Sequence, residues 1–239
     1  MTERHLAADP IVIMGGFAGP SLIYAGMRKA LAEISGQPVY VVPTHVLDWL
    51  PSVVPLGWLH LLTKLRRTVR QAARISATGQ VMVVGHSAGG VLARFLLTGQ
   101  PLLGRVHDER DRIHTLITLG SPHYNRNWQH GGMMSKWVQQ RSPDAAASDK
   151  VRYFCVVGRL LQGSRLGGAR ERRAYRQYKG IAGSGQAWGD GLIPVEAALL
   201  KGAHHVVLDR VAHFAGFGGP WYGDREILPL WWEAQSAGT

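Results

Sequence analysis

Apolar and polar positions form alternating blocks along the chain, and the apolar blocks are of two kinds. Short runs rich in Val, Ile and Leu, bounded by Gly, Pro or polar residues, are typical of buried strands. They cover residues 10–14, 39–42, 80–84, 113–119, 151–157 and 203–208. Longer segments with apolar residues at near-helical spacing lie between them, at 21–35, 59–75, 87–97 and 195–200. This alternation predicts about six mainly parallel strands with helices on both faces, an α/β class of fold.

The length of the chain and the breaks in this alternation indicate its domain organisation. A chain of 239 residues lies within the range of one large domain. Polar and basic segments at about 121–150 and 158–189 interrupt the pattern, and we interpret them as cap or loop insertions over the sheet. We therefore expect one domain over residues 1–239, without internal repeats.

Composition narrows the class of protein. Hydrophobic residues make up 46% of the chain and charged residues 18%, which favours a globular protein. Cys155 is the single cysteine, so disulfides and thiolate zinc sites are excluded, and no other ligand spacing suggests a metal or cofactor. The N-terminal stretch lacks a secretory signal, and no run reaches a membrane-spanning length. We expect a soluble, cytoplasmic protein, unless a targeting peptide has been removed.

The net charge of +11 is concentrated in two segments. One segment holds Lys64, Arg66, Arg67, Arg70 and Arg74, and the other holds Arg159, Arg165, Arg170, Arg172, Arg173, Arg176 and Lys179. These residues form either solvated faces of amphipathic helices or a peripheral contact with anionic lipid. Nucleic acid is not expected as a partner, because no nucleic-acid module accompanies the charge.

The pentapeptide Gly85-His86-Ser87-Ala88-Gly89 stands between a predicted strand and a predicted helix. A turn this sharp strains the backbone of Ser87, and a side chain in place of either glycine would collide with neighbouring elements. The turn lifts the Ser87 hydroxyl above the sheet. There the Ala88 amide and the helix N-terminus face the negative charge that develops on a substrate. We interpret Ser87 as a nucleophile; the alternative is an inert turn that merely needs glycines.

An oxyanion hole requires a second backbone amide, which this arrangement takes from the loop after the first strand predicted here. Gly15-Gly16-Phe17-Ala18-Gly19 occupies that place, and its glycines allow the backbone to approach a substrate closely. The amide of Phe17 is our candidate donor. A tight turn into the next helix is the alternative explanation of these glycines.

A serine hydroxyl needs a histidine to accept its proton and a carboxylate to orient that histidine. The histidines after Ser87 are His114, His123, His130, His204, His205 and His213. His204 and His205 open the last predicted strand, whereas His213 follows it on a loop, at the edge where a base is needed. We predict His213 as the base.

Asp190 is the predicted acid, because flanking glycines allow a tight turn that aims its carboxylate. Asp209 is the competitor, although it lies only four residues before His213 and is placed to end a strand. Glu196 falls inside a predicted helix, where a solvated side chain is expected.

Several motifs together resemble the lipase and esterase branch of the α/β hydrolases. They are Gly85-His86-Ser87-Ala88-Gly89, Thr118-Leu119-Gly120-Ser121-Pro122-His123 and Gly189-Asp190-Gly191-Leu192-Ile193-Pro194. The tail, with Pro220-Trp221-Tyr222-Gly223 and Trp231-Trp232, is similar to a cyanobacterial and plastid group of lipase-like hydrolases. The resemblance implies a minimal α/β-hydrolase fold that lacks the two leading antiparallel strands. It also implies that Ser121-Pro122-His123 shapes the pocket floor.

Two apolar clusters bear on the substrate. They are Leu47, Trp49, Leu50, Val53, Val54, Leu56, Trp58 and Leu59 in one, and Trp128, Met133, Met134 and Trp137 in the other. Either they pack in the core or, as the resemblance implies, they line an acyl-binding groove or a movable cover. We expect a serine hydrolase of small-molecule or acyl-lipid esters. A thioesterase or acyltransferase with the same triad, or a non-catalytic lipid-binding protein, are the alternatives.

Overall fold

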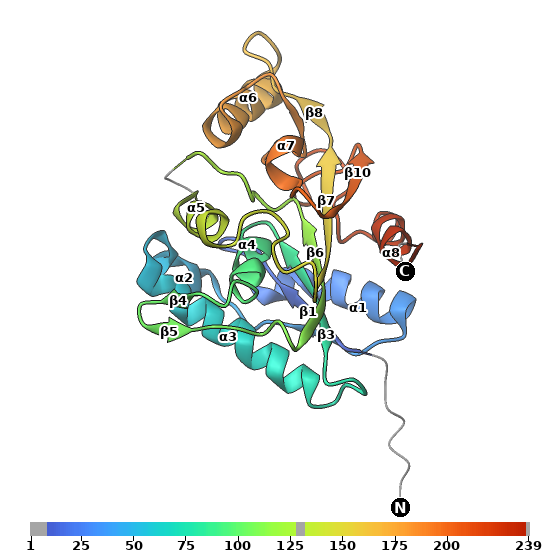
Figure 1. Cartoon of the computed structure of the whole chain (residues 1–239). Helices are drawn as coiled ribbons and strands as arrows, with labels where there is room; N and C mark the ends of the chain where they lie inside the picture. Colours follow the sequence, from blue (N-terminus) through green and yellow to red (C-terminus); the bar gives the residue numbers. More distant parts are fainter. Residues whose placement is uncertain (1–8, 128–131, 238–239) are drawn as a thin grey trace, which may run out of the picture.

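The computed structural model describes residues 9–127 and 132–237. A parallel sheet of six strands, in the order β10-β7-β6-β3-β1-β2, forms its centre (Figure 1). The strands are β1 (Ile11–Met14), β2 (Val39–Val41), β3 (Val81–His86), β6 (Ile113–Leu119), β7 (Arg152–Arg159) and β10 (His204–Asp209). All six coincide with predicted runs, with ends that shift by one or two residues. The predicted fold class is confirmed.

Helices surround this sheet, and two small two-stranded sheets lie outside it in the described part of the chain. The helices are η1 (Ser21–Tyr24), α1 (Ala25–Ser35), α2 (Val46–Trp49), η2 (Leu50–Val53), α3 (Pro55–Ala73), α4 (Ala88–Phe95), α5 (Gly132–Arg141), α6 (Ala169–Ala182), α7 (Val195–Ala198) and α8 (Leu228–Ala237). The two small antiparallel sheets pair β4 (Pro101–Leu102) with β5 (Arg105–Val106) and β8 (Leu161–Gln162) with β9 (Trp188–Gly189). No helix of the described ranges is long and apolar enough to cross a membrane.

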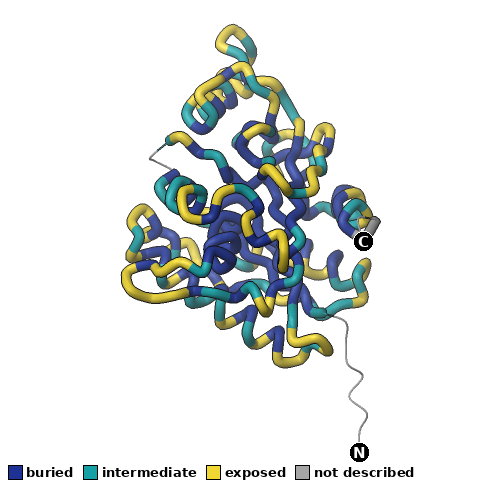
Figure 2. The backbone as a smooth tube through the Cα atoms, in the orientation of Figure 1, coloured by how far each residue is buried: buried dark blue, intermediate teal, exposed yellow. Residues whose placement is uncertain are grey.

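The sheet has a separate apolar core on each face, because side chains alternate along its strands. Ile11 and Ile13 of β1 pack with residues of α1 and α8, whereas Val12 and Met14 pack with α3 and α4. Trp231 is completely buried on the first face and Trp58 is nearly so on the second. Figure 2 shows that the strands of the sheet are largely buried (dark blue), whereas most exposed segments (yellow) lie at the rim of the molecule. Two covered faces explain why the strands read as continuous apolar runs.

Several elements differ from the sequence prediction. Helix α3 begins at Pro55 rather than at residue 59, since proline is well suited to a first helical turn. The predicted helix over 21–35 divides into η1 and α1. Helices α5, α6 and α8 were not predicted at all. The segment 121–150 contains α5, and the segment 158–189 contains β8, α6 and β9. Strand β8 and helix α6 lie beyond the end of β7 (Figure 1).

Candidate active site

Ser87 lies in the tight turn between β3 and α4. Its backbone has φ 53° and ψ −125°, a strained conformation for any residue other than glycine. A Cβ on Gly85 would lie 2.4 Å from the Cα of Gly90, and one on Gly89 would lie 2.4 Å from the carbonyl oxygen of Met14. The backbones of β1, β3 and α4 therefore approach each other as closely as two glycines allow, and the serine projects from their junction.

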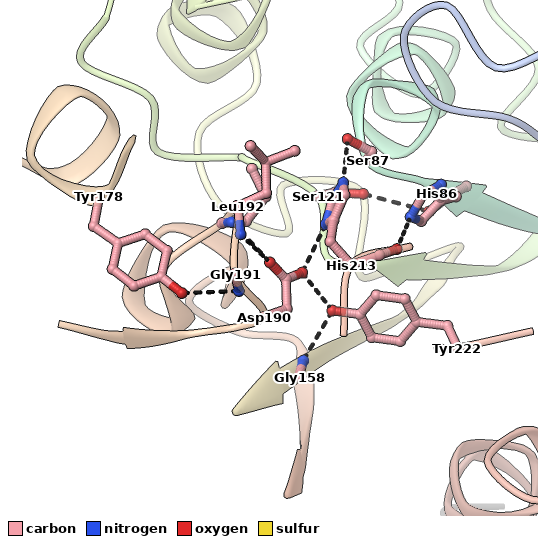
Figure 3. Close-up of polar contacts among 12 residues, drawn as sticks. His86, Ser87, Ser121, Gly158, Tyr178, Asp190, Gly191, Leu192, His213 and Tyr222 are labelled. Atoms are coloured by element: carbon pink, nitrogen blue, oxygen red, sulfur yellow. Dashed lines mark hydrogen bonds and ion pairs between the residues drawn. The ribbon is translucent and has the colours of Figure 1, made fainter. Parts of the chain in front are cut away.

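His213 lies between Ser87 and Asp190 (Figure 3). Its Nε2 is 3.0 Å from Ser87 Oγ, and its Nδ1 is 2.7 Å from Asp190 Oδ2. His213 and Asp190 are fully buried, and Ser87 is 8% exposed. An ionised carboxylate only accepts hydrogen bonds, so Nδ1 carries the proton and the lone pair of Nε2 faces the serine hydroxyl. This is the tautomer that a general base requires.

Two loops at the same edge of the sheet bring the acid and the histidine together. Asp190 directly follows β9 and His213 follows β10, and the amide of His213 donates to the carbonyl oxygen of Asp190 at 2.9 Å. Asp209, the competing acid, ends β10 and pairs instead with exposed Arg159 at 2.6 Å. Glu196 is exposed on α7. The three predicted side chains are thus adjacent, and both competing carboxylates point elsewhere.

Four donors surround the carboxylate of Asp190. The amides of Leu192 and Ile193 donate to Oδ1 at 3.0 and 2.7 Å, while His213 and the Tyr222 hydroxyl donate to Oδ2, the latter at 2.7 Å. Tyr222 also accepts from the amide of Gly158 at 2.9 Å. Burial, reinforced by the charge of Asp190, raises the pKa of Tyr222 well above its usual value, so the hydroxyl keeps its proton. These donors hold the carboxylate of Asp190 in one orientation.

Gly120, directly after β6, packs against this arrangement. It has φ 54°, and a Cβ there would lie 2.6 Å from Asp190 Oδ2 and 3.0 Å from His213 Nδ1. Any side chain would displace the acid or the histidine. Neither Gly120 nor Tyr222 was predicted as a site residue. A glycine at a strand end and a tyrosine in the tail were the available signals, but both contacts arise only from the folded chain.

The two predicted oxyanion donors both lie at the cavity that contains Ser87. Phe17 and Ala88 both line the cavity at the serine. Ala88 is the first residue of α4, so its amide has no acceptor within the helix. In the described part of the chain, the backbone N–H of Phe17 donates no hydrogen bond. Both N–H groups are therefore available to an oxyanion.

A buried chain of hydrogen bonds connects the loop that carries Phe17 with the histidine loop. The amide of Gly16 donates to Tyr24 Oη at 2.8 Å, Tyr24 Oη lies 2.8 Å from His86 Nδ1, and His86 Nε2 lies 3.1 Å from the carbonyl oxygen of His213. A carbonyl can only accept, so His86 donates from Nε2 and accepts from Tyr24 at Nδ1. Burial, together with nearby His213, holds the pKa of His86 well below its usual value. His86 is therefore neutral, with its single proton on Nε2.

The cavity at Ser87 has a volume of about 170 Å³ and mainly apolar walls. They are formed by Phe17, Ala88, Pro122, Ile181, Leu192, Ile193 and Phe214, with Asn125, Asn127 and Gln177 as polar contributions beside Ser87. An ester carbonyl at the serine would thus have apolar surroundings for its acyl group.

Among the described residues, no member of either apolar cluster lines this cavity. Trp49 and Trp58 are buried in the core, and Trp137 stacks on Phe95 at 4.2 Å between ring centroids. The leucines and valines at 47, 50, 53 and 56 are exposed on the surface. Trp128 lies outside the described residues. Helix α6 contributes Gln177 and Ile181 to the wall of the cavity at Ser87, and the loop after Asp190 contributes Leu192 and Ile193.

The motif Ser121-Pro122-His123 is only partly at the cavity. Pro122 lines it, but His123 is fully buried away from it, with its Nε2 3.1 Å from Thr118 Oγ1 and its Nδ1 3.5 Å from Arg94 Nη1. Burial, followed by the charge of Arg94, holds the pKa of His123 well below its usual value. His123 therefore supports the structure beneath the site. Among the described residues, no group of three or more His, Cys, Asp or Glu side chains could hold a metal ion.

Comparison with known proteins places this geometry in a wider context. A family model described as the PGAP1-like alpha/beta domain matches residues 60–151, less than half of the chain. No curated protein matches the sequence. The structure of Est1E from Butyrivibrio proteoclasticus is similar over 98% of this chain and 90% of that chain, at 14% identity and a TM-score of 0.54.

Another similar structure is a pyrethroid hydrolase from Sphingobium faniae JZ-2, at 21% identity and a TM-score of 0.32. That likeness covers 49% of this chain, which spans only 42% of the hydrolase. The likeness to Est1E extends over nearly the whole chain, and the parallel sheet has the sharp turn at Ser87 between β3 and α4. The chain therefore has the α/β-hydrolase fold that the sequence motifs implied.

Proposed function

We propose that this protein is a serine hydrolase that cleaves carboxylic esters through an acyl-enzyme on Ser87. The observation that carries the proposal is the engagement of both nitrogens of His213, with Ser87 Oγ at 3.0 Å and Asp190 Oδ2 at 2.7 Å. These are the distances that a nucleophile, base and orienting acid require. An inert turn or a purely lipid-binding scaffold gives no reason for a fully buried pair of His213 and Asp190.

The arrangement suggests the following steps. His213 Nε2 takes the proton of Ser87 as Oγ attacks the ester carbonyl carbon, and the amides of Phe17 and Ala88 stabilise the oxyanion. Asp190 keeps the imidazolium oriented while the alcohol leaves with the proton from Nε2. Water, activated by the same nitrogen, then releases the acid and regenerates the serine. The apolar walls around the serine favour substrates with an apolar acyl group.

The direct test combines a fluorophosphonate probe with a chain-length series of p-nitrophenyl esters. Ser87→Ala should abolish both labelling and turnover, and His213→Ala should lower turnover by about six orders of magnitude, as removal of the base does in another serine triad. Ser148→Ala, at an exposed serine remote from the cavity, serves as the matched control and should retain both activities. Turnover by Ser87→Ala at the wild-type rate would refute the proposal.

The same residues could transfer the acyl group to an acceptor other than water, or cleave a thioester. Supplying matched oxygen esters and thioesters, with and without a nucleophilic alcohol, distinguishes these reactions by their products. Free acid as the dominant product from the oxygen ester supports the hydrolase, and an acylated alcohol as the dominant product makes it a transferase.

A further inference from the structure

Helix α6 extends across two neighbouring cavities. Arg170, Arg173, Gln177 and Ile181 follow each other at intervals of three or four residues, which places them along one side of the helix. Gln177 and Ile181 line the cavity at Ser87, whereas Arg170 and Arg173 line a second cavity of about 250 Å³. Arg173 and Gln177 are separated by about one helical turn, or roughly 6 Å along the axis.

The second cavity adjoins the first on its other walls as well. Gly191 lines the second cavity, and the next residue, Leu192, lines the first. Phe217 also lines the second cavity and Phe214 the first, and the centroids of their rings lie 6.2 Å apart. A small ester at Ser87 can therefore extend its far end towards the two arginines.

Guanidinium N–H groups of Arg170 and Arg173 are available to a ligand. Arg170 uses Nη2 to donate to the carbonyl oxygen of Phe217, while the guanidinium of Arg173 lies 5.3 Å from the centroid of the Phe217 ring. Within residues 9–127 and 132–237, neither arginine forms an ion pair, and the side chain of Arg173 forms no hydrogen bond. A guanidinium has five N–H donors in a planar fork that matches phosphate oxygens.

The adjoining side of α6 adds further positive charge. Arg172, Arg176 and Lys179 line a cavity of about 590 Å³ together with Arg165 from the preceding loop. Among the described residues, none of these four is in an ion pair, and Glu171 is the one acidic residue of the helix. Cations of one sign on a single helix produce a strong local field that favours a doubly charged anion over a singly charged one.

Resting on the proposed function, we propose that the cavity at Arg170 and Arg173 binds a phosphate group of the ester substrate while its acyl group occupies the apolar cavity at Ser87. The protein is then selective for phosphate-bearing esters over neutral esters of the same acyl chain. Arg173 is the residue that confers this selectivity most directly, because its donors are free and its neighbour one turn along the helix lines the ester cavity.

The test uses a matched pair of water-soluble substrates, butyryl glycerol and butyryl glycerol phosphate. The wild type should prefer the phosphate ester in kcat/KM, mainly through a lower KM. Arg173→Gln should reduce this preference by about tenfold, the effect of losing one charge-assisted contact of about 1.5 kcal/mol. Arg173→Lys, which keeps the charge without the fork, should retain part of it. Arg67→Gln, at an exposed arginine of α3, is the control and should leave the preference unchanged.

A binding measurement separates this inference from the proposed function. Calorimetry with Ser87→Ala protein should show that butyryl glycerol phosphate binds more tightly than butyryl glycerol, and that adding Arg173→Gln removes the difference. If neither ester is hydrolysed by the wild type but this difference in binding persists, the proposed function fails and the phosphate site stands. Equal binding of both esters overturns the phosphate site.

Two further arms identify the source of the phosphate. Inorganic phosphate that binds as tightly as the phosphate ester would overturn the assignment to substrate and make the cavity a site for free phosphate. Sedimentation with vesicles of anionic lipid that depends on Arg173, without any difference between the soluble esters, would make α6 a membrane contact and overturn the assignment too.

Discussion

Helices α3 and α6 carry similar positive charge but use it in opposite ways. On α3, Arg66 Nε and Arg70 Nε both lie 2.7 Å from Glu109 Oε1, and Lys64 Nζ lies 2.7 Å from Asp48 Oδ2. The side chain of Glu109 is completely buried. These pairs tie α3 to α2 and to the segment before β6, while the side chain of Arg70 remains 42% exposed.

On α6, by contrast, the positive charges form no ion pairs within the described residues and line two cavities, of which the one at Arg170 and Arg173 adjoins the cavity at Ser87. Paired charges in the first region stabilise the fold. Unpaired charges in the second repel each other and are available to a ligand. A count of Lys and Arg along the sequence does not distinguish these uses, because the distinction depends on where the carboxylates lie in the folded chain.

The largest expected effect is on α3. Glu109→Gln removes a buried negative charge that Arg66 and Arg70 share. The glutamine also directs N–H donors towards these arginines, which are donors themselves. We therefore expect the free energy of unfolding to fall by about 3 kcal/mol. Denaturation by urea measures this loss. Activity towards neutral esters should persist in the folded fraction, since Glu109 lies outside the cavity at Ser87. A loss below about 1 kcal/mol would mean that the paired region does not hold α3 in place.

A second difference should appear on acidification. His86 and His123, on the site side, are neutral in the folded protein because burial lowers the pKa of each. Both gain a proton on unfolding below about pH 6.5, so the unfolded state binds more protons and stability falls as pH falls. Each histidine contributes about 1.4 kcal/mol per pH unit.

Asp48, beside α3, responds at lower pH. Burial alone would raise the pKa of its carboxyl, but hydrogen bonds from Lys64, the His45 amide and His60 outweigh burial and lower it. The stability that Asp48 contributes is therefore complete above about pH 4 and is lost only as pH falls further.

The histidine prediction is tested by urea unfolding between about pH 8 and pH 5. The free energy of unfolding should fall with falling pH, and His123→Gln should reduce the slope of this dependence. A free energy of unfolding that stays constant over this range would contradict the assignment of neutral buried histidines.

The smallest expected effect is on α6. Arg172 and Arg176 are four residues apart and so repel each other on the helix surface. Arg176→Gln should raise the free energy of unfolding by about 0.3 kcal/mol, whereas Arg66→Gln on α3 should lower it. Thermal and urea unfolding of the two variants measure the opposite signs. A clear loss of stability in Arg176→Gln would show that α6 has compensating partners and would remove the contrast between the helices.

Much of the sheet could be predicted because its strands are local features. Each is a short run of β-branched and apolar residues that ends at glycine, proline or a polar residue, as at Ile11–Met14. The placement of Ser87, Asp190 and His213 near each other was also predictable, because the ends of parallel strands meet at one edge of a sheet. Their catalytic roles remain predictions for the experiments above.

The remainder depends on contacts between distant parts of the chain. Tyr222 meets Asp190 across 32 positions, and Tyr24 meets His86 across 62. No local periodicity reports such pairs. Apolar composition also does not locate the cavity at Ser87, because an exposed leucine at position 47 and a buried tryptophan at 49 look alike as apolar residues in a sequence. Burial, and not residue type, separates them.

The hydrogen-bond chain through Tyr24 and His86 has a consequence for how related sequences can change. Its direction is fixed at both ends, by the amide of Gly16 and by the carbonyl oxygen of His213. A phenylalanine at position 24 would leave His86 Nδ1 without a donor, and an apolar residue at 86 would leave the hydroxyl of Tyr24 without an acceptor in a dry environment. Among relatives of this chain, positions 24 and 86 should therefore change together, and sequences that retain one polar partner should retain the other.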